Sequence, residues 1–523
     1  MESNTLLLVS GAILFTLAIL KLQRNRLDTD QLTSAPNVGT RSNQFFAHTR
    51  AAFRSITATA STVYEGYNRF CKAGGSPFSI PNLGNGSITV LPPSQFDILH
   101  QTESDIKAFP IQMEVMQPRY LMGDHDEMLF KNAIQFDVVR KYMNKDVGYF
   151  AAGTADELDN VFRNRFRYPS GSAVTADVWD TCLQIIGRTA NRAIIGLPLC
   201  RNEVLLEQST KYANAVFQGA SLISSFPAYL RPIVGPVIGL AAKGYSKRCK
   251  RIMVPYVDER LQEWRAGSGT ENPNDAIQWI IERSAKGDPS DLEPNIIAQR
   301  LLILQLVSIY TTTYALSNIL VNLYSSESKD DFIAGLRSEC DRVAAGHNGL
   351  SSKEAIDQLY RLDSTVRESL RISPFSVIAP LRIVGSPGGI DLGNGIHLPR
   401  GARLGVPFQA LHHDAEFYPN PLQFDAFRYS REFEGSGVTN RQATEQETCV
   451  TASKTFVTFG YGRHLCPGRW YTSQTLKQAL AYLIQNYDVE FEGHRKQPRS
   501  LLNIILPPLG ARINIRQRVS AVQ

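Results

Sequence analysis

The sequence lacks the cysteine spacings that mark a disulfide framework or a zinc cluster. Its seven cysteines are an odd number, and no Cys-x-x-Cys pair occurs among positions 71, 182, 200, 249, 340, 449 and 466. Disulfide scaffolds pair an even number of closely spaced cysteines, and zinc clusters use short spacings. The pattern therefore argues against both kinds of site and favours a reducing compartment.

Internal repeats, low-complexity tracts and long runs of like charge are also absent. The 55 basic and 49 acidic residues leave a net charge of only +6 over 523 residues. Nucleic-acid-binding domains carry a strong and clustered positive charge, so that class is not predicted. The mild excess of positive charge favours an acidic protein partner or anionic lipid. With 43% hydrophobic and 20% charged residues, the chain can form a large globular core.

Histidines are few, and they form only one tight cluster, His412-His413-Asp414. Neighbouring side chains on a helix or a strand point apart and do not converge on one metal ion. We therefore interpret this cluster as structural and predict no metal site built from histidines.

Long uncharged apolar runs are rare, and the first covers residues 6–20, followed by three basic residues. This length is at the short end of what can span a bilayer. A cleaved signal peptide is the alternative, but such peptides carry positive charge before the apolar run, where this chain has Glu2. The positive-inside rule keeps the following chain in the cytosol. We predict a single-pass anchor over residues 1–26, a linker over 27–59 and one large domain over 60–523.

A second apolar stretch covers residues 295–324 and contains no proline. A second transmembrane helix is one reading of this length. Lipid exposure is disfavoured by four polar residues, Gln299, Arg300, Gln305 and Asn318. We predict a buried central helix. Three consecutive threonines at 311–313 are poor helix formers, and their hydroxyls can distort a helix at a functional site or simply bond core carbonyls.

The remaining pattern predicts a mainly α protein with minor β structure. Apolar spacing of three and four residues predicts helices that include residues 209–218, 256–264 and 353–370, the second beginning at Pro255. Short strands are expected between 375 and 430, where Pro and Gly become frequent. A helix follows Gly468, and two strands joined through Pro507-Pro508 close the chain.

The most informative stretch is Phe459-Gly-Tyr-Gly-Arg-His-Leu-Cys-Pro-Gly468. Its three glycines favour a tight loop, and Pro467 suits the first position of a helix. Cys466 would then lie at a helix N-terminus, where the dipole lowers the pKa of a thiol. A thiolate held there is a good ligand for a soft, redox-active metal.

This stretch resembles the haem-binding loop of cytochromes P450, whose pattern Phe-x-x-Gly-x-(Arg/His)-x-Cys-x-Gly is met at every fixed position. The resemblance implies the cytochrome P450 fold, haem b, and Cys466 as the axial ligand of its iron, where thiolate donation favours O–O cleavage. It extends over residues 60–515 and is nearest to fungal members related to ent-kaurene oxidase. The cofactor-binding positions that it implies are Phe459, Gly460, Gly462, His464, Gly468 and Arg382, with His464 and Arg382 at haem propionates.

Glu368 and Arg371 lie three residues apart on one predicted helical face. Alone, such a pair is usually a weak surface salt bridge. Their position before the cysteine loop resembles the family's Glu-x-x-Arg pair, which locks to a third arginine, here Arg428. The resemblance implies that this trio supports the loop. The family's Trp-x-x-x-Arg has no clear counterpart between residues 110 and 150.

Residues 307–312 stand where the family has Ala-Gly-x-(Asp/Glu)-Thr-Thr. The resemblance places Thr311 and Thr312 in the catalytic helix, with Thr311 beside dioxygen and helping to deliver protons. Tyr310 replaces the usual acid, and a phenol is a far weaker acid than a carboxyl group. Our hypothesis is that Thr311 and ordered water carry protons while Tyr310 shapes the pocket.

The resemblance further implies an endoplasmic reticulum enzyme that receives electrons from NADPH–cytochrome P450 reductase, with cytochrome b5 as a second candidate donor. The expected docking cations are Lys454, Arg463, Arg469 and Lys477. Apolar candidate pocket segments imply a lipophilic secondary metabolite such as a terpenoid or a prenylated alkaloid. Residues 225–234 are expected to make a second, shallow membrane contact.

Two other functions stay open at this point. A haem-thiolate isomerase or dehydratase would need no reductase, and the Tyr310 departure is compatible with it. A haem-binding carrier or sensor would bind a ligand without turnover. Incorporation of oxygen that depends on NADPH separates a monooxygenase from both.

Overall fold

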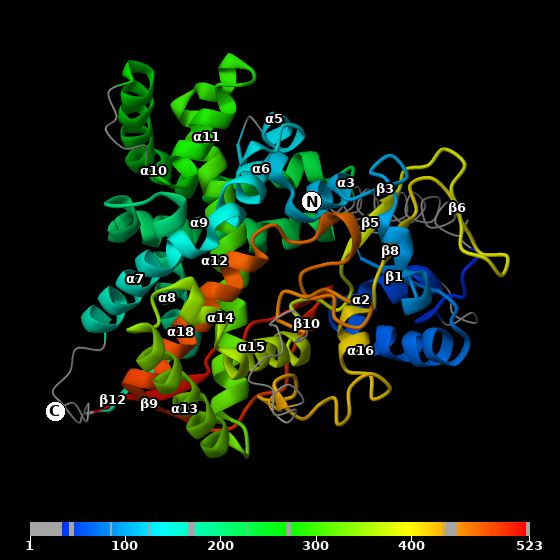
Figure 1. Cartoon of the computed structure of the whole chain (residues 1–523). Helices are drawn as coiled ribbons and strands as arrows, with labels where there is room; N and C mark the ends of the chain where they lie inside the picture. The colour runs from blue at the N-terminus through cyan, green and yellow to red at the C-terminus, as the bar shows by residue number, and fades with distance from the viewer. Residues whose placement is uncertain are drawn as a thin grey trace, which may run out of the picture.

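The computed structural model describes residues 34–40, 46–83, 86–123, 126–165, 173–226, 228–267, 273–431, 434 and 447–518. The predicted anchor over residues 1–26 lies outside the described residues. Helices fill most of the molecule, and a smaller strand-rich region lies at one end, on the right in Figure 1. The predicted class, mainly α with minor β, is confirmed.

The helices are α2 (Ala47–Gly66), α3 (Phe109–Met116), α4 (Pro118–Leu121), α5 (Asp126–Lys131), α6 (Ile134–Lys141), α7 (Phe150–Arg165), α8 (Val178–Ile194), α9 (Glu203–Ser225), α10 (Arg231–Ala266), α11 (Ala276–Ser284), α12 (Pro294–Tyr324), α13 (Lys329–His347), α14 (Lys353–Asp357), α15 (Tyr360–Ile372), α16 (Phe408–His412) and α18 (Arg469–Asn486). A π-helical turn over Tyr67–Lys72 continues α2, and short 3-10 turns cover Pro93–His100, Met143–Tyr149, Leu199–Arg201, Pro289–Leu292 and Gly462–His464.

The strands form small sheets. A five-stranded sheet has the order β1-β2-β8-β5-β3, in which only β2 and β8 are parallel. An antiparallel three-stranded sheet has the order β4-β12-β9, and β6–β7 and β10–β11 are pairs. Their bounds are β1 (Phe78–Asn82), β2 (Gly86–Val90), β3 (Ile106–Lys107), β4 (Ala173–Asp177), β5 (Leu381–Val384), β6 (Ile390–Asp391), β7 (His397–Leu398), β8 (Arg403–Gly405), β9 (Tyr487–Glu492), β10 (Ser500–Leu501), β11 (Ile504–Ile505) and β12 (Arg512–Gln517).

Helix α12 is the centre of the largest core and packs against α8, α10 and α15. Among the described residues it alone is long and apolar enough to cross a membrane, yet 78% of its apolar window is buried inside the protein. Its Arg300 is fully buried and donates to Asp291 at 2.6 Å and to Gln135 at 2.6 Å. The prediction of a buried central helix is therefore confirmed.

The structure corrects the predicted linker boundary. Residues 47–59 are not linker but the first part of α2, which packs against β1. Val63 and other apolar side chains of α2 are buried there, so this segment belongs to the folded domain.

One predicted secondary-structure feature is wrong. Pro255 does not begin a helix, because α10 runs through both Pro236 and Pro255. Both prolines lie on its exposed side, where water can bond the carbonyl groups that lose an N–H partner. The chain closes in two strands on either side of Pro507-Pro508, as predicted. β11 turns back onto β10, whereas β12 inserts Ile513 and Ile515 into the core between β4 and β9.

Candidate active site

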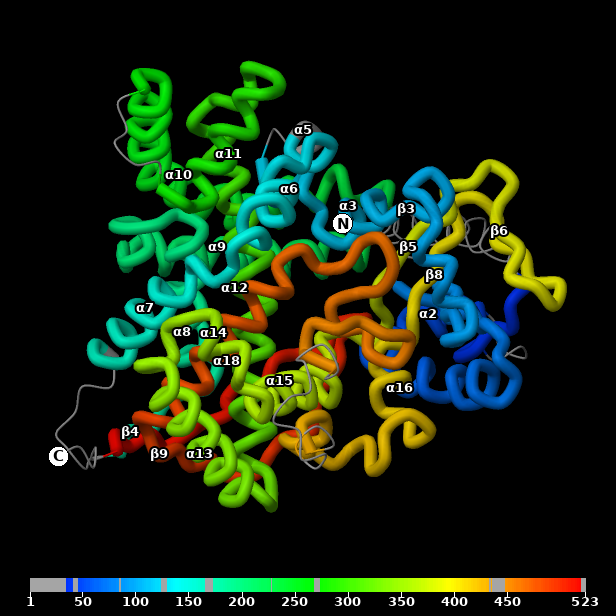
Figure 2. The backbone as a smooth tube through the Cα atoms, viewed as in Figure 1, coloured from blue at the N-terminus to red at the C-terminus, as the bar shows by residue number. Residues whose placement is uncertain are grey.

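The Cys466 loop leads into α18, and the tube in Figure 2 shows it in orange beside the central helices. The Cys466 amide donates to the Phe459 carbonyl at 2.8 Å, and the Gly460 amide donates to Val457 at 2.8 Å. Gly460 and Gly462 have φ angles of 87° and 79°, which side-chain-bearing residues rarely adopt. A Cβ on Gly462 would lie 2.2 Å from the Leu99 carbonyl oxygen. The loop therefore needs glycine at 462 for both its conformation and its close contact.

The helix after the loop begins after Gly468, as predicted. Gly468 is the N-cap and α18 starts at Arg469, so Pro467 precedes the helix and is not its first residue. The Pro467 carbonyl accepts from the Asn144 side chain at 2.8 Å, and the Cys466 carbonyl accepts from Arg469 at 3.0 Å. These bonds satisfy the two carbonyl groups outside the helix.

The Cys466 thiol also differs from expectation. Burial raises its pKa, while the Gly468 and Arg469 amides and the Arg469 charge act in the opposite direction. The protein alone therefore does not lower the pKa of this thiol below its usual value. A bound metal cation would favour its thiolate form.

Cys466 differs from the other six cysteines in being partly exposed, since all the others are buried. Burial raises the pKa of Cys71, Cys182, Cys200 and Cys249 to about 12. Buried apolar thiols of this kind are inert packing groups. Cys466 is thus the only cysteine placed to bind a ligand.

Beside the loop lies a group of nitrogen donors. Arg382 on β5 is 4% exposed, and its Nε and one Nη have no hydrogen-bond partner among the described residues. Burial lowers the pKa of Arg382 to about 10, against the opposing effect of Glu103. His464 contacts Glu103 at 2.7 Å, and burial and the Arg382 charge lower its pKa. Unpartnered buried guanidinium atoms call for anionic oxygens, which is what haem propionates supply. These residues therefore fit haem.

Glu368, Arg371 and Arg428 converge as the sequence indicated. Arg371 donates two bonds to Glu368 at 2.8 Å each, and Arg428 donates a third at 3.0 Å. Arg371 also donates to the carbonyls of His412 at 2.6 Å and Pro421 at 2.8 Å. Glu368 and Arg371 are fully buried. The trio ties α15 to the segment that precedes the cysteine loop.

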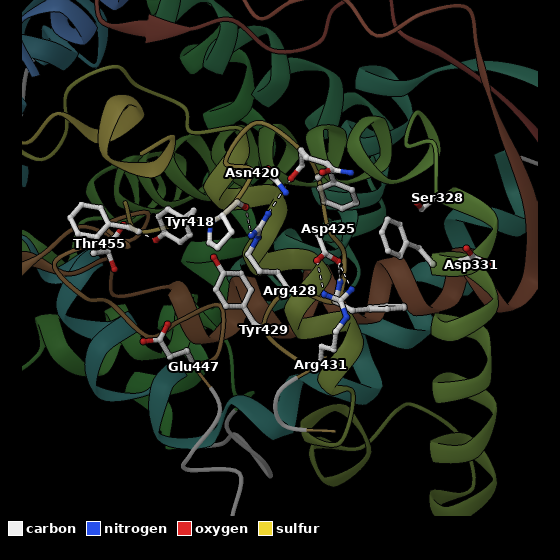
Figure 3. Close-up of a pocket in the computed structure, with 16 residues that line it drawn as sticks. Ser328, Asp331, Tyr418, Asn420, Asp425, Arg428, Tyr429, Arg431, Glu447 and Thr455 are labelled. Atoms are coloured by element: carbon white, nitrogen blue, oxygen red, sulfur yellow. Dashed lines mark hydrogen bonds and ion pairs between the residues drawn. The ribbon is translucent and has the colours of Figure 1, made fainter. Parts of the chain in front are cut away.

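Arg428 also lines a cleft of about 1110 Å³, together with Tyr418, Tyr429, Asp425 and Arg431. Figure 3 shows these side chains, with Arg431 paired to Asp425. Neither Cys466 nor Thr311 lines this cleft. It is part of the supporting scaffold and not the active site.

On α12 the three predicted catalytic residues have different surroundings. Thr311 is exposed, and its hydroxyl donates to the Val307 carbonyl at 2.7 Å. Thr312 is buried. Tyr310 stacks on Phe217 of α9 with ring centroids 4.2 Å apart and meets Trp179 edge-on at 5.2 Å. Burial raises the pKa of Tyr310, so it is not an acid in place of the missing carboxyl group.

The predicted docking cations are not equivalent. Lys477 is buried, donates to the Ile356 carbonyl at 3.2 Å and lies 3.5 Å from Asp363, so it cannot contact a partner. Lys454 pairs with Asp97 at 2.7 Å, and Arg463 is exposed while donating to His100 at 2.9 Å. The prediction that Lys477 contacts a partner is wrong because its side of α18 faces the interior of the protein.

Sequence reasoning missed Glu103 and Asn144. Glu103 accepts from the amides of Ala108 and Phe109 at 2.9 and 3.1 Å and holds His464. Both residues lie more than 300 positions before the loop they contact, and neither belongs to a motif. Nothing in the sequence alone indicates that these two residues contact the loop.

Comparisons with known proteins agree with this geometry. The sequence model of the family Cytochrome P450 matches residues 67–515. Cytochrome P450 monooxygenase htyF of Aspergillus rugulosus is 36% identical over 489 residues, covering 90% of this chain and 70% of that protein. Cytochrome P450 monooxygenase gloP of Glarea lozoyensis is 33% identical over 490 residues, covering 91% and 89%. Cytochrome P450 monooxygenase okaG of Penicillium ochrochloron is 28% identical over 487 residues, covering 88% and 90%. The chain therefore belongs to the cytochrome P450 family, which binds haem through an iron–thiolate bond, and is a monooxygenase.

Proposed function

We propose that this enzyme inserts one oxygen atom from O2 into a lipophilic secondary metabolite, such as a terpenoid or a prenylated alkaloid, with Cys466 as the axial ligand of haem b. The observation that carries the proposal is the pairing of one partly exposed cysteine with a buried arginine, Arg382, of which two side-chain nitrogens have no hydrogen-bond partner among the described residues. The fungal origin of the relatives supports the substrate class. The chemistry supplied by bound haem is activation of O2 for transfer of one atom to carbon.

The protein's own contribution at the cysteine side is positioning. Cys466 holds the iron, Phe459 packs beside it, and Gly460, Gly462 and Gly468 give the loop its shape. Arg382 and His464 bind the propionates. Glu368, Arg371 and Arg428 fix the segment before the loop, because three charge-assisted bonds in a buried site hold one geometry.

On the substrate side, Thr311 is the group that moves a proton. Its hydroxyl is held by the Val307 carbonyl and remains exposed, so it can pass a proton to and from ordered water. Thr312 supports it from the buried side, and Tyr310 shapes the pocket wall. A Thr311→Ala enzyme should consume NADPH with much less product formed per reductant. If Thr311→Ala formed as much product per NADPH consumed as the wild type, this role of Thr311 would be wrong.

The electron donor in this proposal is NADPH–cytochrome P450 reductase, with cytochrome b5 as an auxiliary donor. Fungal members of the family are commonly membrane-anchored. We place the chain in the endoplasmic reticulum membrane as a single-pass protein, with residues 1–26 as anchor, residues 47–523 as the cytosolic catalytic domain and residues 225–234 as a second contact. Tyr229 in this contact is 41% exposed.

The deciding experiment is the absorption spectrum of the reduced protein with carbon monoxide. Thiolate ligation shifts the main band strongly to the red, and Cys466→Ser should abolish this shift. Cys340→Ala, in a buried cysteine, is the matched control and should leave the band unchanged. Undegraded wild-type protein without the shifted band would overturn Cys466 as ligand. Oxygen incorporation that depends on NADPH then tests the reaction itself.

A further inference from the structure

The exposed side of α10 changes in chemistry along the helix axis. Its first exposed residues are all apolar, and they are Pro232, Ile233, Pro236, Val237, Leu240 and Ala241. Ile233, Val237 and Leu240 are 68, 68 and 67% exposed. The next exposed side chains are basic, at Lys247, Arg248 and Arg251. Surface helices usually separate apolar from polar residues around the axis, so a separation along the axis needs another explanation.

The apolar half is held firmly outward. On its opposite side, Gly235 and Gly239 press against Tyr120 of α4, and a Cβ on Gly239 would lie 2.0 Å from the Tyr120 carbonyl oxygen. Arg231 donates to the carbonyls of Phe226 and Ser224 at 2.9 and 3.1 Å. The exposed apolar residues are therefore not a loosely packed core. An exposed apolar patch fixed in this way marks an interaction surface.

The basic half borders a cleft of about 700 Å³ between α10 and the start of α12. Four cations line it, Lys243, Lys247, Lys250 and Arg251, against one carboxylate, Glu293. Lys243, Lys247 and Arg251 form no ion pair with a carboxylate in the part of the chain that the structure describes. Because these residues recur every three or four positions, their charges lie on one side of the helix and repel one another. An anion with several acceptor oxygens removes this repulsion.

The floor of the cleft is polar and ordered. Ser246 is buried and donates to Gln299 of α12 at 3.2 Å, and Gln299 contacts the Tyr212 hydroxyl at 3.5 Å. The cleft is thus wide, positively charged and hydrogen-bonding, which suits a phosphoryl group and not an apolar substrate.

We propose that this cleft binds the phosphoryl headgroup of an anionic phospholipid while the apolar half of α10 enters the acyl layer. Leu240 and Lys247 are separated by seven residues, or about 10 Å along the helix. When the N-terminal end of α10 enters the acyl layer with its axis inclined to the membrane plane, this rise brings the cations toward the level of the headgroup phosphates. A soluble phosphorylated ligand would explain the cations but not the apolar residues beside them. The inference rests on the membrane attachment proposed above and names the lipid class.

The test uses the full-length, haem-loaded protein in neutral detergent, with short-chain phosphatidylserine as probe and short-chain phosphatidylcholine as reference. Native mass spectrometry counts the bound lipids. Wild type should bind phosphatidylserine in preference. Because each cation donates charge-assisted hydrogen bonds to the phosphoryl group, Lys247→Gln with Arg251→Gln should weaken this binding by at least about 10-fold. Arg265→Gln with Lys286→Gln removes the same charge from exposed sites outside the cleft and should leave it unchanged.

Three results would overturn the headgroup site. They are no preference for phosphatidylserine, equal weakening in the control pair, and displacement of the lipid by inorganic phosphate at the same concentration. The last result would identify a site for soluble phosphate compounds.

The membrane contact is judged separately in vesicles of brominated phosphatidylcholine. Fluorescence of Val237→Trp should be quenched beyond wild type, whereas Leu422→Trp, at an exposed site outside α10, should not be. Absence of quenching at 237 would overturn the acyl-layer half of the inference whatever the lipid binding shows.

Discussion

The cysteine side and the α9–α10 side of this enzyme are stabilised in different ways. Around Glu368 and Arg371, buried charges meet fixed partners at 2.8–3.0 Å. Around α10, close packing at Gly235 and Gly239 leaves an exposed apolar surface on the other side of the helix. The first side is specified by directional bonds between few residues. The α9–α10 side depends on the close fit of packed side chains, which many combinations of residues can provide.

The largest contrast should appear when one carboxylate is neutralised on each side. Glu368→Gln leaves Arg371 and Arg428 without a counter-charge in a buried site, so the free energy of unfolding should fall by about 3–5 kcal/mol. Glu114→Gln, in α3 which packs against α9, breaks a partly exposed pair with Arg403 of β8, whose shortest contact is 2.9 Å, and should cost at most about 1 kcal/mol. Denaturant unfolding measures both. Equal losses would mean that the two sides do not differ in this respect.

The cysteine side should also respond to pH through Glu339. This carboxylate accepts the amides of Arg361 and Leu362 at 2.8 and 3.0 Å, and burial raises its pKa from 4.5 to about 7. A raised pKa means that the folded protein binds the proton more tightly, so this contribution to stability is present below pH 4.5 and is lost as pH rises to about 7. The whole effect is at most about 3 kcal/mol.

The pH experiment compares wild type with Glu339→Gln in denaturant unfolding from pH 4.5 to 8. The difference between the two is the readout, because buried His412 and His413 have lowered pKa values and act in the opposite direction. A constant difference across this range would contradict the prediction.

Replacement of Arg382 should raise the stability of the haem-free protein but weaken its hold on haem. Arg382→Met removes two unpartnered buried nitrogens, so the haem-free protein should gain about 1–3 kcal/mol of stability. The same change removes charged bonds to the propionates, so haem should dissociate roughly 10- to 100-fold faster. The rate of haem transfer to apomyoglobin measures haem dissociation, and denaturant unfolding of the haem-free protein measures its stability. A variant that loses stability in both forms would show that Arg382 is purely structural.

The smallest effect is expected on the substrate side, at Tyr310. Its ring contacts Phe217 and Trp179, and its hydroxyl makes no hydrogen bond among the described residues. Tyr310→Phe should therefore change stability and coupling by less than about 0.5 kcal/mol. Tyr310→Leu should lose about 1 kcal/mol, because aromatic pairs contribute about that much beyond burial. A marked uncoupling in Tyr310→Phe would restore the phenol as a proton carrier.

The same contrast decides what the sequence could predict. The cysteine loop, the Glu368 trio and the buried α12 were all predicted, because directional chemistry restricts which residues can stand at fixed spacings. The start of α18 after Gly468 was also predicted, whereas Pro467 lies outside the helix, where its carbonyl accepts a bond from Asn144 that the sequence does not indicate. Lys477 was assigned to the surface because the sequence does not show which side of a helix the rest of the protein covers.

On the α9–α10 side, the continuity of α10 through Pro255 could not be predicted, since it depends on which side of the helix faces water. The ring stack that holds Tyr310 likewise joins residues on three different helices. No short motif records such a contact, because packing between distant segments is satisfied by many combinations of apolar residues.

The two side-chain nitrogens of Arg382 that lack hydrogen-bond partners should make a chain without haem less stable than one that has bound it. A ligand that binds only the folded form stabilises it by mass action. Chains that leave the ribosome when haem is scarce therefore carry an uncompensated charge and open more often. Quality-control proteases act on the opened population, so a difference of one or two kcal/mol changes abundance several-fold. We therefore expect the abundance of this enzyme to rise and fall with the supply of haem.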